Sequence, residues 1–170
     1  MKKAGVWSPA PNQEVLGVEW NETGWIVSVN GRGDAACPTC RARSVSRHSS
    51  YCRSLHDLPV QGVPVKVQAW LTRWRCRNDQ CGQRIFSERL PDLATPYARR
   101  TTRLAGIVRL VGHAAGGRPA ERLMRRLGMP IDRTTILRMI KRRDQTNTGA
   151  SFVRVVGIDD WATLAKVPAA

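Results

Sequence analysis

The pattern of apolar and polar positions indicates β-strands in the first half of the chain. Residues 15–20 and 25–29 are rich in β-branched and aromatic side chains, and a four-residue loop separates them. This arrangement predicts a β-hairpin. Residues 63–76 alternate more regularly, and a turn joins them to a shorter strand expected at residues 53–58. The apolar face of the later strand comprises Val65, Val67, Ala69 and Leu71.

From about residue 99 the apolar positions recur every three or four residues, which predicts helices. The first helix covers residues 101–113. Glycines at 116 and 117 end it, and a short second helix stops near residue 128. Asp132 is placed to cap a third helix. The side chains expected to point inward are Leu104, Ile107, Val108 and Val111, then Leu123, Met124 and Leu127, and finally Ile136, Leu137 and Ile140.

The charge of the chain adds an expected partner, a polyanion, to this α+β fold. The 170 residues include 28 Lys and Arg against 13 Asp and Glu, a net charge of +15. Residues 37–98 hold ten basic and four acidic side chains, and residues 99–143 hold thirteen and two, whereas both ends are nearly neutral. An excess this concentrated predicts a nucleic-acid partner.

Membrane and secretory classes are excluded by the same pattern. No apolar run approaches the roughly 20 residues that a membrane span needs. The basic start, Met1 to Lys3, is not followed by the apolar stretch of a signal peptide. We therefore expect a cytoplasmic protein whose thiols are reduced. The odd number of cysteines, five, also argues against a disulfide framework.

Four of the cysteines form two close pairs, Cys37 with Cys40 and Cys76 with Cys81, separated by 35 residues. Each pair lies on a tight turn, so that two thiolates can point at one centre. Two such knuckles supply the tetrahedral four-sulfur geometry of structural Zn²⁺. Metal binding would also stabilise a region that has few bulky apolar residues.

Cys52, His48 and His56 stand apart from these pairs. None has a neighbouring Cys or His at knuckle spacing, and a closed four-thiolate site has no vacancy for them. We interpret Cys52 as a free thiol and the two histidines as polar strand residues or phosphate contacts.

The three expected helices have the layout of a helix-turn-helix, in which the third helix enters the major groove. Arg can pair with guanine in bidentate fashion and Thr offers a hydroxyl and a methyl group, so both suit base readout. The other basic side chains are expected to meet phosphates. The base-edge candidates are Arg133, Thr134, Thr135 and Arg138, and the phosphate candidates are Lys141, Arg142, Arg143, Arg118, Arg122, Arg125 and Arg126.

Residues 152–158 predict a buried strand that ends in Asp159 and Asp160. An RNase H-like nuclease places its first Mg²⁺ ligand at the end of such a strand. Taken alone, a strand that ends in two aspartates is more often a plain turn.

Several motifs in the order in which they occur resemble bacterial insertion-sequence transposases of the ISL-three family. The resemblance extends over residues 15–162, with the expected helix-turn-helix in its place. The motifs are Leu16-Gly17-Val18-Glu19, Cys37-Pro38-Thr39-Cys40, Leu58-Pro59 with Gly62 and Pro64, Arg75-Cys76-Arg77-Asn78 with Cys81, Ile85-Phe86-Ser87-Glu88-Arg89-Leu90-Pro91, and Val156-Gly157-Ile158-Asp159-Asp160-Trp161-Ala162.

The resemblance implies a zinc-binding N-terminal domain, a helix-turn-helix that recognises the terminal inverted repeats of the element, and a DDE catalytic domain that cuts and joins DNA with Mg²⁺. Asp159 matches the first catalytic aspartate of the family. The second Asp and the Glu of the family are expected further along than residue 170, so we expect Asp159 to be vestigial and this chain alone to be inactive.

The resulting hypothesis is the DNA-binding portion of a transposase, truncated at the start of its catalytic domain, acting on double-stranded insertion-sequence ends. It leaves open a homodimer or a heteromer with full-length transposase. The alternatives are a zinc-ribbon and helix-turn-helix transcription regulator, one part of a split active DDE transposase, and the product of a decaying gene. The expected units are residues 1–36, a β-hairpin; 37–92, a β-rich zinc domain; 99–145, the helix-turn-helix; and 152–170, one orphan strand of an RNase H-like domain.

Overall fold

The computed structural model describes residues 8–10, 13–31 and 35–144, apart from the side chains of 142–144. Five strands precede three helices in this part of the chain, which confirms the expected α+β class. The expected strand at 152–158 lies outside the described residues. The strands are β1 (Val15–Asn21), β2 (Gly24–Asn30), β3 (Arg47–Val60), β4 (Val63–Arg75) and β5 (Ile85–Ser87), and the helices are α1 (Thr102–Ala115), α2 (Gly117–Arg126) and α3 (Arg133–Asp144).

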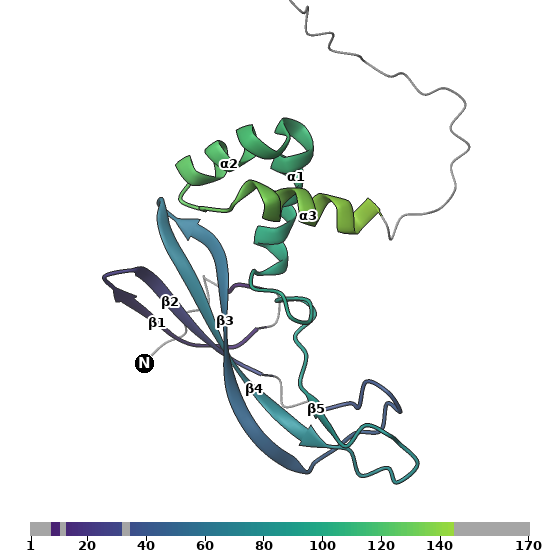
Figure 1. The fold of residues 1–170 in the computed structure, drawn as a ribbon. Coiled ribbons are helices and arrows are strands. Elements are labelled where there is room, and N and C mark those ends of the chain that lie inside the picture. The colour runs from purple at the N-terminus through teal and green to yellow at the C-terminus, as the bar shows by residue number, and fades with distance from the viewer. Residues whose placement is uncertain (1–7, 11–12, 32–34, 145–170) are drawn as a thin grey trace, which may run out of the picture.

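The strands form one mixed sheet in the order β1-β2-β4-β3, with β5 paired to β4 (Figure 1). The β1–β2 hairpin is confirmed, and β2 joins β4 in parallel from Trp25 opposite Val65 to Asn30 opposite Trp70. The sheet thus includes strands from both segments 1–36 and 37–92. No helix among the described residues is long and apolar enough to cross a membrane.

Strand β3 is longer than the sequence indicates. It begins at Arg47 rather than near Arg53, and its first residues are polar. Pairing with β4, in which Arg47 lies opposite Trp74 and Tyr51 opposite Leu71, makes this segment extended. The partner strand determines the conformation here, because residues 47–52 have no apolar alternation of their own.

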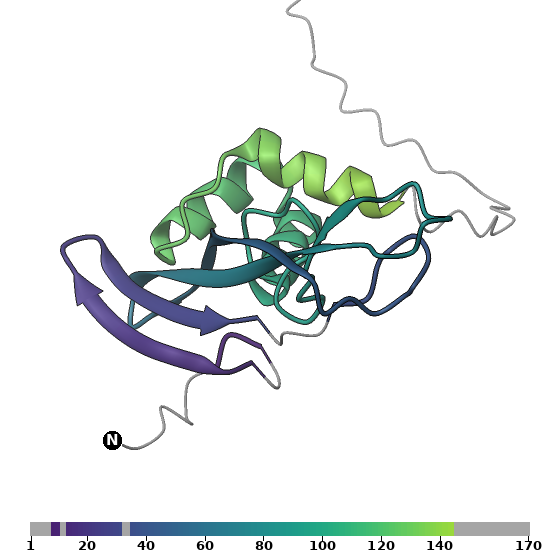
Figure 2. The ribbon, with the colours of Figure 1, turned by 90° about the horizontal axis from the view of Figure 1, so that it is seen from below.

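The main core lies on one face of β4, as predicted. Its four apolar side chains are at most 3% exposed. The segment between β5 and α1 crosses this face, and its Leu90, Leu93 and Ala94 complete the core (Figures 1 and 2). Leu93 is 1% exposed, so this irregular segment is held on the sheet by apolar burial.

A second core holds the three helices together. Leu104, Val108, Met124 and Ile136 are at most 2% exposed. The inward positions predicted for Leu123, Leu127 and Leu137 are wrong, since these side chains are 42–51% exposed. Helix α2 has ten residues and buries only the narrow stripe of Ala120 and Met124. Gly117 occupies the place where α2 meets α3, so Leu137 packs on its backbone at the edge of the core rather than in its centre.

Buried polar contacts join the helices to the sheet. The Asp57 carboxylate on β3 accepts hydrogen bonds from Thr101 Oγ1 at 2.6 Å and from Arg103 Nε at 2.8 Å, and Arg103 Nη2 binds its second oxygen. The side chain of Asp57 is fully buried. The backbone of the preceding residue, His56, adds two hydrogen bonds: its N–H donates to the Arg99 carbonyl, and its carbonyl accepts from the Thr101 N–H.

A glycine turn makes a second junction between the helices and the sheet. Gly128, after α2, has φ +74°, and a Cβ there would lie 2.7 Å from the carbonyl oxygen of Gly62 in the β3–β4 turn. Only glycine allows both the positive φ and this approach. The turn before α3 is therefore supported directly by the tip of the β3–β4 hairpin.

We expect Asp57→Ala to lower the free energy of unfolding by about 3 kcal/mol, because it leaves the buried Thr101 hydroxyl and a partly buried guanidinium without their acceptor. Urea unfolding measures the change. The control, Glu121→Ala, removes an exposed i,i+4 pair with Arg125 at 3.3 Å and should change stability by less than about 0.5 kcal/mol. Equal effects of the two substitutions would contradict the role given to Asp57.

Asp132 caps α3, as predicted, by accepting hydrogen bonds from the Thr134 N–H at 2.8 Å and from its hydroxyl. These hydrogen bonds lower the pKa of Asp132 below its ordinary value of 3.8. A folded pKa below the unfolded one stabilises α3 above the unfolded pKa, and this stabilisation is lost as pH falls through the folded pKa.

We expect the carboxyl group of Asp132 to titrate by NMR with a midpoint below 3.8, accompanied by a shift of the Thr134 amide signal. Asp132→Asn keeps a capping oxygen and should remove that titration of Thr134. A midpoint at or above 3.8 would show that the cap does not form in solution.

Candidate metal centre

The four paired cysteines lie at the end of the β3–β4 hairpin that is opposite the helices (Figure 1). Cys37 and Cys40 precede β3, whereas Cys76 and Cys81 lie between β4 and β5. Antiparallel pairing of β3 with β4 brings the two loops to the same end of the sheet. The sheet therefore closes a gap of 35 residues in sequence.

The first loop is a tight knuckle. Arg41 N–H donates to the Cys37 carbonyl at 2.8 Å, and Cys37 N–H donates to the Ala42 carbonyl at 3.0 Å. Arg41 adopts φ +60°, which costs a non-glycine residue on the order of 1 kcal/mol. This conformation curls the backbone so that both sulfur atoms of the loop point the same way.

The second loop has an equivalent set of contacts. Cys76 N–H donates to the Arg84 carbonyl at 2.9 Å, and Cys81 N–H donates to the Asn78 carbonyl at 3.0 Å. The Asn78 side chain accepts from Gln80 N–H at 3.0 Å, which forms an Asx turn. The longer spacing of this pair is thus taken up by a local turn.

All four sulfur atoms lie within 4.8 Å of one another. Cys40 and Cys76 are 3.6 Å apart, and Cys37 and Cys81 are 3.9 Å apart. A tetrahedral Zn²⁺ with Zn–S bonds of about 2.3 Å requires sulfur separations of about 3.8 Å. The cysteines fit the metal, and because protein fills all four positions, the Zn²⁺ is structural.

The close packing of the thiols shifts their pKa values in opposite directions. The backbone N–H of Ala42 lowers the pKa of Cys40 to about 6, with further hydrogen bonds from the neighbouring thiols. At Cys76 the N–H of Asn78 acts in the same direction, but burial and the neighbouring thiols outweigh it and raise the pKa to about 12. Several like charges cannot share this small volume unless a cation compensates them, which Zn²⁺ does.

The remaining candidate ligands stay outside the cluster. Cys52 is a largely exposed free thiol on β3, and partial desolvation raises its pKa. His48 faces the hydroxyl of Ser49 at 3.0 Å. Burial and the charges of Arg100 and Lys66 lower the pKa of His56.

Comparison with known families agrees with this geometry. Residues 34–81 match the family described as the zinc-finger of transposase IS204/IS1001/IS1096/IS1165. This stretch of the chain is similar to a transposase zinc finger. The match includes all four cysteines and covers 48 of 170 residues. No curated protein and no solved structure matches the chain. The zinc finger supports the resemblance noted in the sequence and a structural Zn²⁺ at the cysteines.

The candidate DNA-contacting residues lie at the other end of the hairpin. The structure gathers them on two adjacent helices, with side chains that are exposed except for a half-buried Thr135. The side chains of Arg142 and Arg143, and all of Asp159, lie outside the described residues. Helix α3 has Arg133, Thr134, Thr135, Arg138 and Lys141, and α2 has Arg118, Arg122, Arg125 and Arg126.

Sequence reasoning missed a further set of basic residues on the strands and on the segment before α1. Arg53 and Arg73 lie on neighbouring strands, and Arg99 lies 26 positions after Arg73. No local motif connects them, because only the strand register and the path of residues 88–101 bring them to one side of the sheet.

We expect the chain to bind one Zn²⁺ per molecule, and Cys76→Ser to abolish this binding because three thiolates leave the tetrahedron incomplete. The zinc content measured by mass spectrometry of the purified protein tests this. Cys52→Ser is the matched control and should retain a full equivalent. Chelation should unfold the zinc finger and alter its amide NMR signals, while signals of α1–α3 persist. Full zinc content in the Cys76 variant would contradict the assignment.

Proposed function

We propose that this chain is the DNA-binding portion of a transposase, and that its three helices form a helix-turn-helix that recognises the terminal inverted repeats of an insertion sequence. The observation that carries the proposal is a transposase zinc finger followed by a three-helix unit with an arginine-rich exposed surface. The combination favours a DNA partner over a general polyanion, because both parts would act on the same duplex.

The packing of the helices supports this reading of them. A Cβ added to Gly112 on α1 would lie 2.7 Å from Ile136 Cγ2 on α3, so the two helices approach closely. Residues 127–132 connect α2 to α3, and the Asp132 cap defines where α3 begins. In a compact helical unit of this kind the start of α3 faces outward, as major-groove binding requires.

The charge distribution on the two helices supports separate roles. Arg138 and Thr134 are exposed on α3, whose first turn contains no acidic residue. They would face base edges. The arginines of α2 are also exposed, and phosphate contacts from them would position the protein on the duplex. Glu121, paired with Arg125, is the single acidic residue of α2.

The function proposed for this chain is DNA binding, without a catalytic step. The resemblance implies Mg²⁺ at a site that includes Asp159, which lies outside the described residues. No chemical step is therefore assigned to any described side chain.

We expect Arg138→Ala to weaken binding to a duplex of the element's terminal repeat by roughly ten- to a hundred-fold, and to reduce the preference for that duplex over a scrambled one. Fluorescence anisotropy with both duplexes measures the two effects. The control is Arg122→Ala, a phosphate contact, which should weaken binding to both duplexes equally.

A zinc chelator should also weaken binding of the unsubstituted chain to the terminal repeat, because the zinc finger holds one end of the molecule. The proposed function would be refuted if the affinity were the same for both duplexes and were unaffected by the chelator. Preference for an operator upstream of a gene, rather than for element ends, would replace it with a regulatory one.

A further inference from the structure

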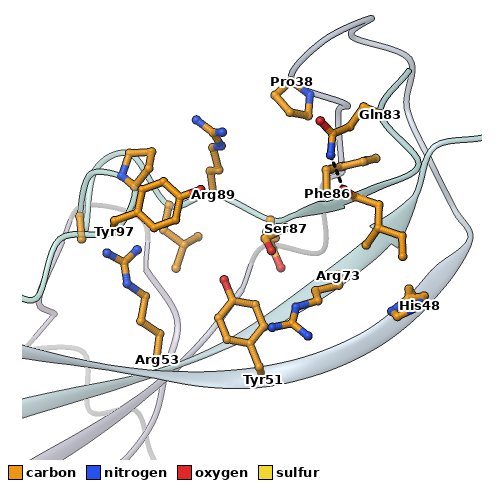
Figure 3. Close-up of a pocket in the computed structure, with 15 residues that line it drawn as sticks. Pro38, His48, Tyr51, Arg53, Arg73, Gln83, Phe86, Ser87, Arg89 and Tyr97 are labelled. Carbon is orange, nitrogen blue, oxygen red and sulfur yellow. Dashed lines mark hydrogen bonds between the residues drawn. The ribbon is translucent and has the colours of Figure 1, made fainter. Parts of the chain in front are cut away.

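Two clefts lie side by side along the segment that connects β5 to α1. The first, about 750 Å³, lies between the strands and the segment after β5. Tyr51, Arg53 and Arg73 line it from the strands, and Arg89 and Tyr97 face them from the opposite wall (Figure 3). The first cleft extends to the zinc finger, where Pro38 and Gln83 form its end.

The second cleft, about 790 Å³, lies next to α1 and α3. Arg99, Arg100 and Arg109 line it together with Thr135 and Arg138 of α3. Pro96 and Tyr97 line both clefts, so the two adjoin along this short segment. We call the combined surface the basic track. It leads from the exposed face of α3 to the first zinc knuckle.

The basic track is almost free of negative charge. Its single acidic lining residue is Glu88, which is buried, accepts a hydrogen bond from Thr72 N–H at 3.3 Å and lies against Gly31. No described residue forms an ion pair with any of the seven lining arginines. Arg73 lies over the ring of Tyr51, 4.7 Å from its centre, and this stacking leaves its N–H groups available for an anion.

Two arginines of the basic track, Arg109 and Arg100, would be stabilised by a bound anion. The Nε of Arg109 is buried and has no hydrogen-bond partner among the described residues. An unsatisfied buried donor is costly unless a ligand accepts from it. Burial and the neighbouring charge of Arg99 lower the pKa of Arg100, so the charged guanidinium there is under repulsion that an anion would relieve.

Tyr97 stands at the junction of the two clefts. Its side chain is 98% exposed, and its backbone adopts φ +60°. A non-glycine residue in this conformation is strained, and such strain concentrates at functional positions. The carbonyls on either side, of Thr95 and Ala98, accept hydrogen bonds from Arg53, which holds the loop in place. The exposed ring offers a surface on which a sugar or a base can stack.

We propose that the basic track binds one sugar–phosphate strand of the DNA duplex, from the site contacted by α3 toward the zinc finger. This inference rests on the proposed function and adds Arg73, Arg89, Arg109 and Tyr97 to the DNA interface. Guanidinium groups pair with phosphate oxygens in bidentate geometry, and a row of them suits a regularly spaced polyanion. These contacts are independent of base sequence, whereas those of α3 are not.

The test is the salt dependence of binding to a random-sequence duplex of about 30 base pairs, long enough to cover the whole track. Arg73→Gln with Arg89→Gln removes two phosphate contacts. We expect the slope of log K against log salt to become shallower by about 1.8, and the affinity at physiological salt to fall roughly ten-fold or more. Both side chains are exposed, and zinc content and urea midpoint should stay unchanged.

Lys66→Gln is the control for the track. Lys66 is exposed on β4, on the face opposite Val65, Val67 and the cleft, and its substitution removes one positive charge without touching the track. We expect its slope and affinity to remain close to those of the unsubstituted chain. Arg138→Ala, measured as the preference for the terminal repeat over a scrambled duplex, reports on base readout by α3.

The outcomes separate the two proposals. If the double Gln variant keeps the slope of the unsubstituted chain, or changes it no more than Lys66→Gln does, the track does not bind DNA and the inference is wrong. In that case a loss of sequence preference in Arg138→Ala still supports the proposed function. If the unsubstituted chain binds neither duplex, the proposed function fails and this inference fails with it. Tighter binding to a single strand than to the duplex would also overturn the inference as stated.

Discussion

A buried carboxylate ties the helices of this molecule to its sheet. Asp57 on β3 has no solvent contact, and its acceptor oxygens are filled by Thr101 and Arg103 at the start of α1. Thr101 also caps that helix by accepting from Leu104 N–H, so one hydroxyl both starts α1 and ties it to the sheet. A buried charge tolerates few alternative arrangements, so this contact, together with the close approach of Gly128 to Gly62, restricts how the helices lie on the sheet.

The two ends of the β3–β4 hairpin are stabilised by different means. At the helix end, Val108, Met124 and Ile136 are fully buried and supply ordinary apolar packing. At the other end the buried cluster consists mainly of the cysteines with Ala35 and Phe86. So small a cluster buries little apolar area, and the metal supplies the missing free energy. Loss of zinc therefore affects one end of the sheet first.

The features that depend on short-range patterns could be predicted from the sequence. The Cys37/Cys40 and Cys76/Cys81 spacing identified the zinc ligands, and the alternation in β4 identified the core face. The cap at Asp132 followed from residue type and position. In each case a few neighbouring residues determine the local geometry and the chemistry together.

The features that depend on long-range pairing could not be predicted. Parallel pairing of β2 with β4 leaves no local signal, and polar residues 47–52 become strand only because β4 lies beside them. Leu137 has the right helical spacing for burial, yet it packs on Gly117 at the edge of the core and stays 42% exposed. The basic track belongs to this class as well, since register and chain path create it rather than any motif.

The alternation of side chains along β3 and β4 also restricts how such a protein can change. Thirteen or fourteen residues in each strand separate the zinc site from the helices by about 40 Å. Removing one residue from both strands would turn every core side chain beyond that point to the wrong face. The distance between metal and helices can therefore lengthen or shorten only in steps of two residues per strand, about 7 Å, which is close to the rise of two base pairs. The pleat of the sheet therefore sets the smallest step by which the distance between the metal and the helices can change.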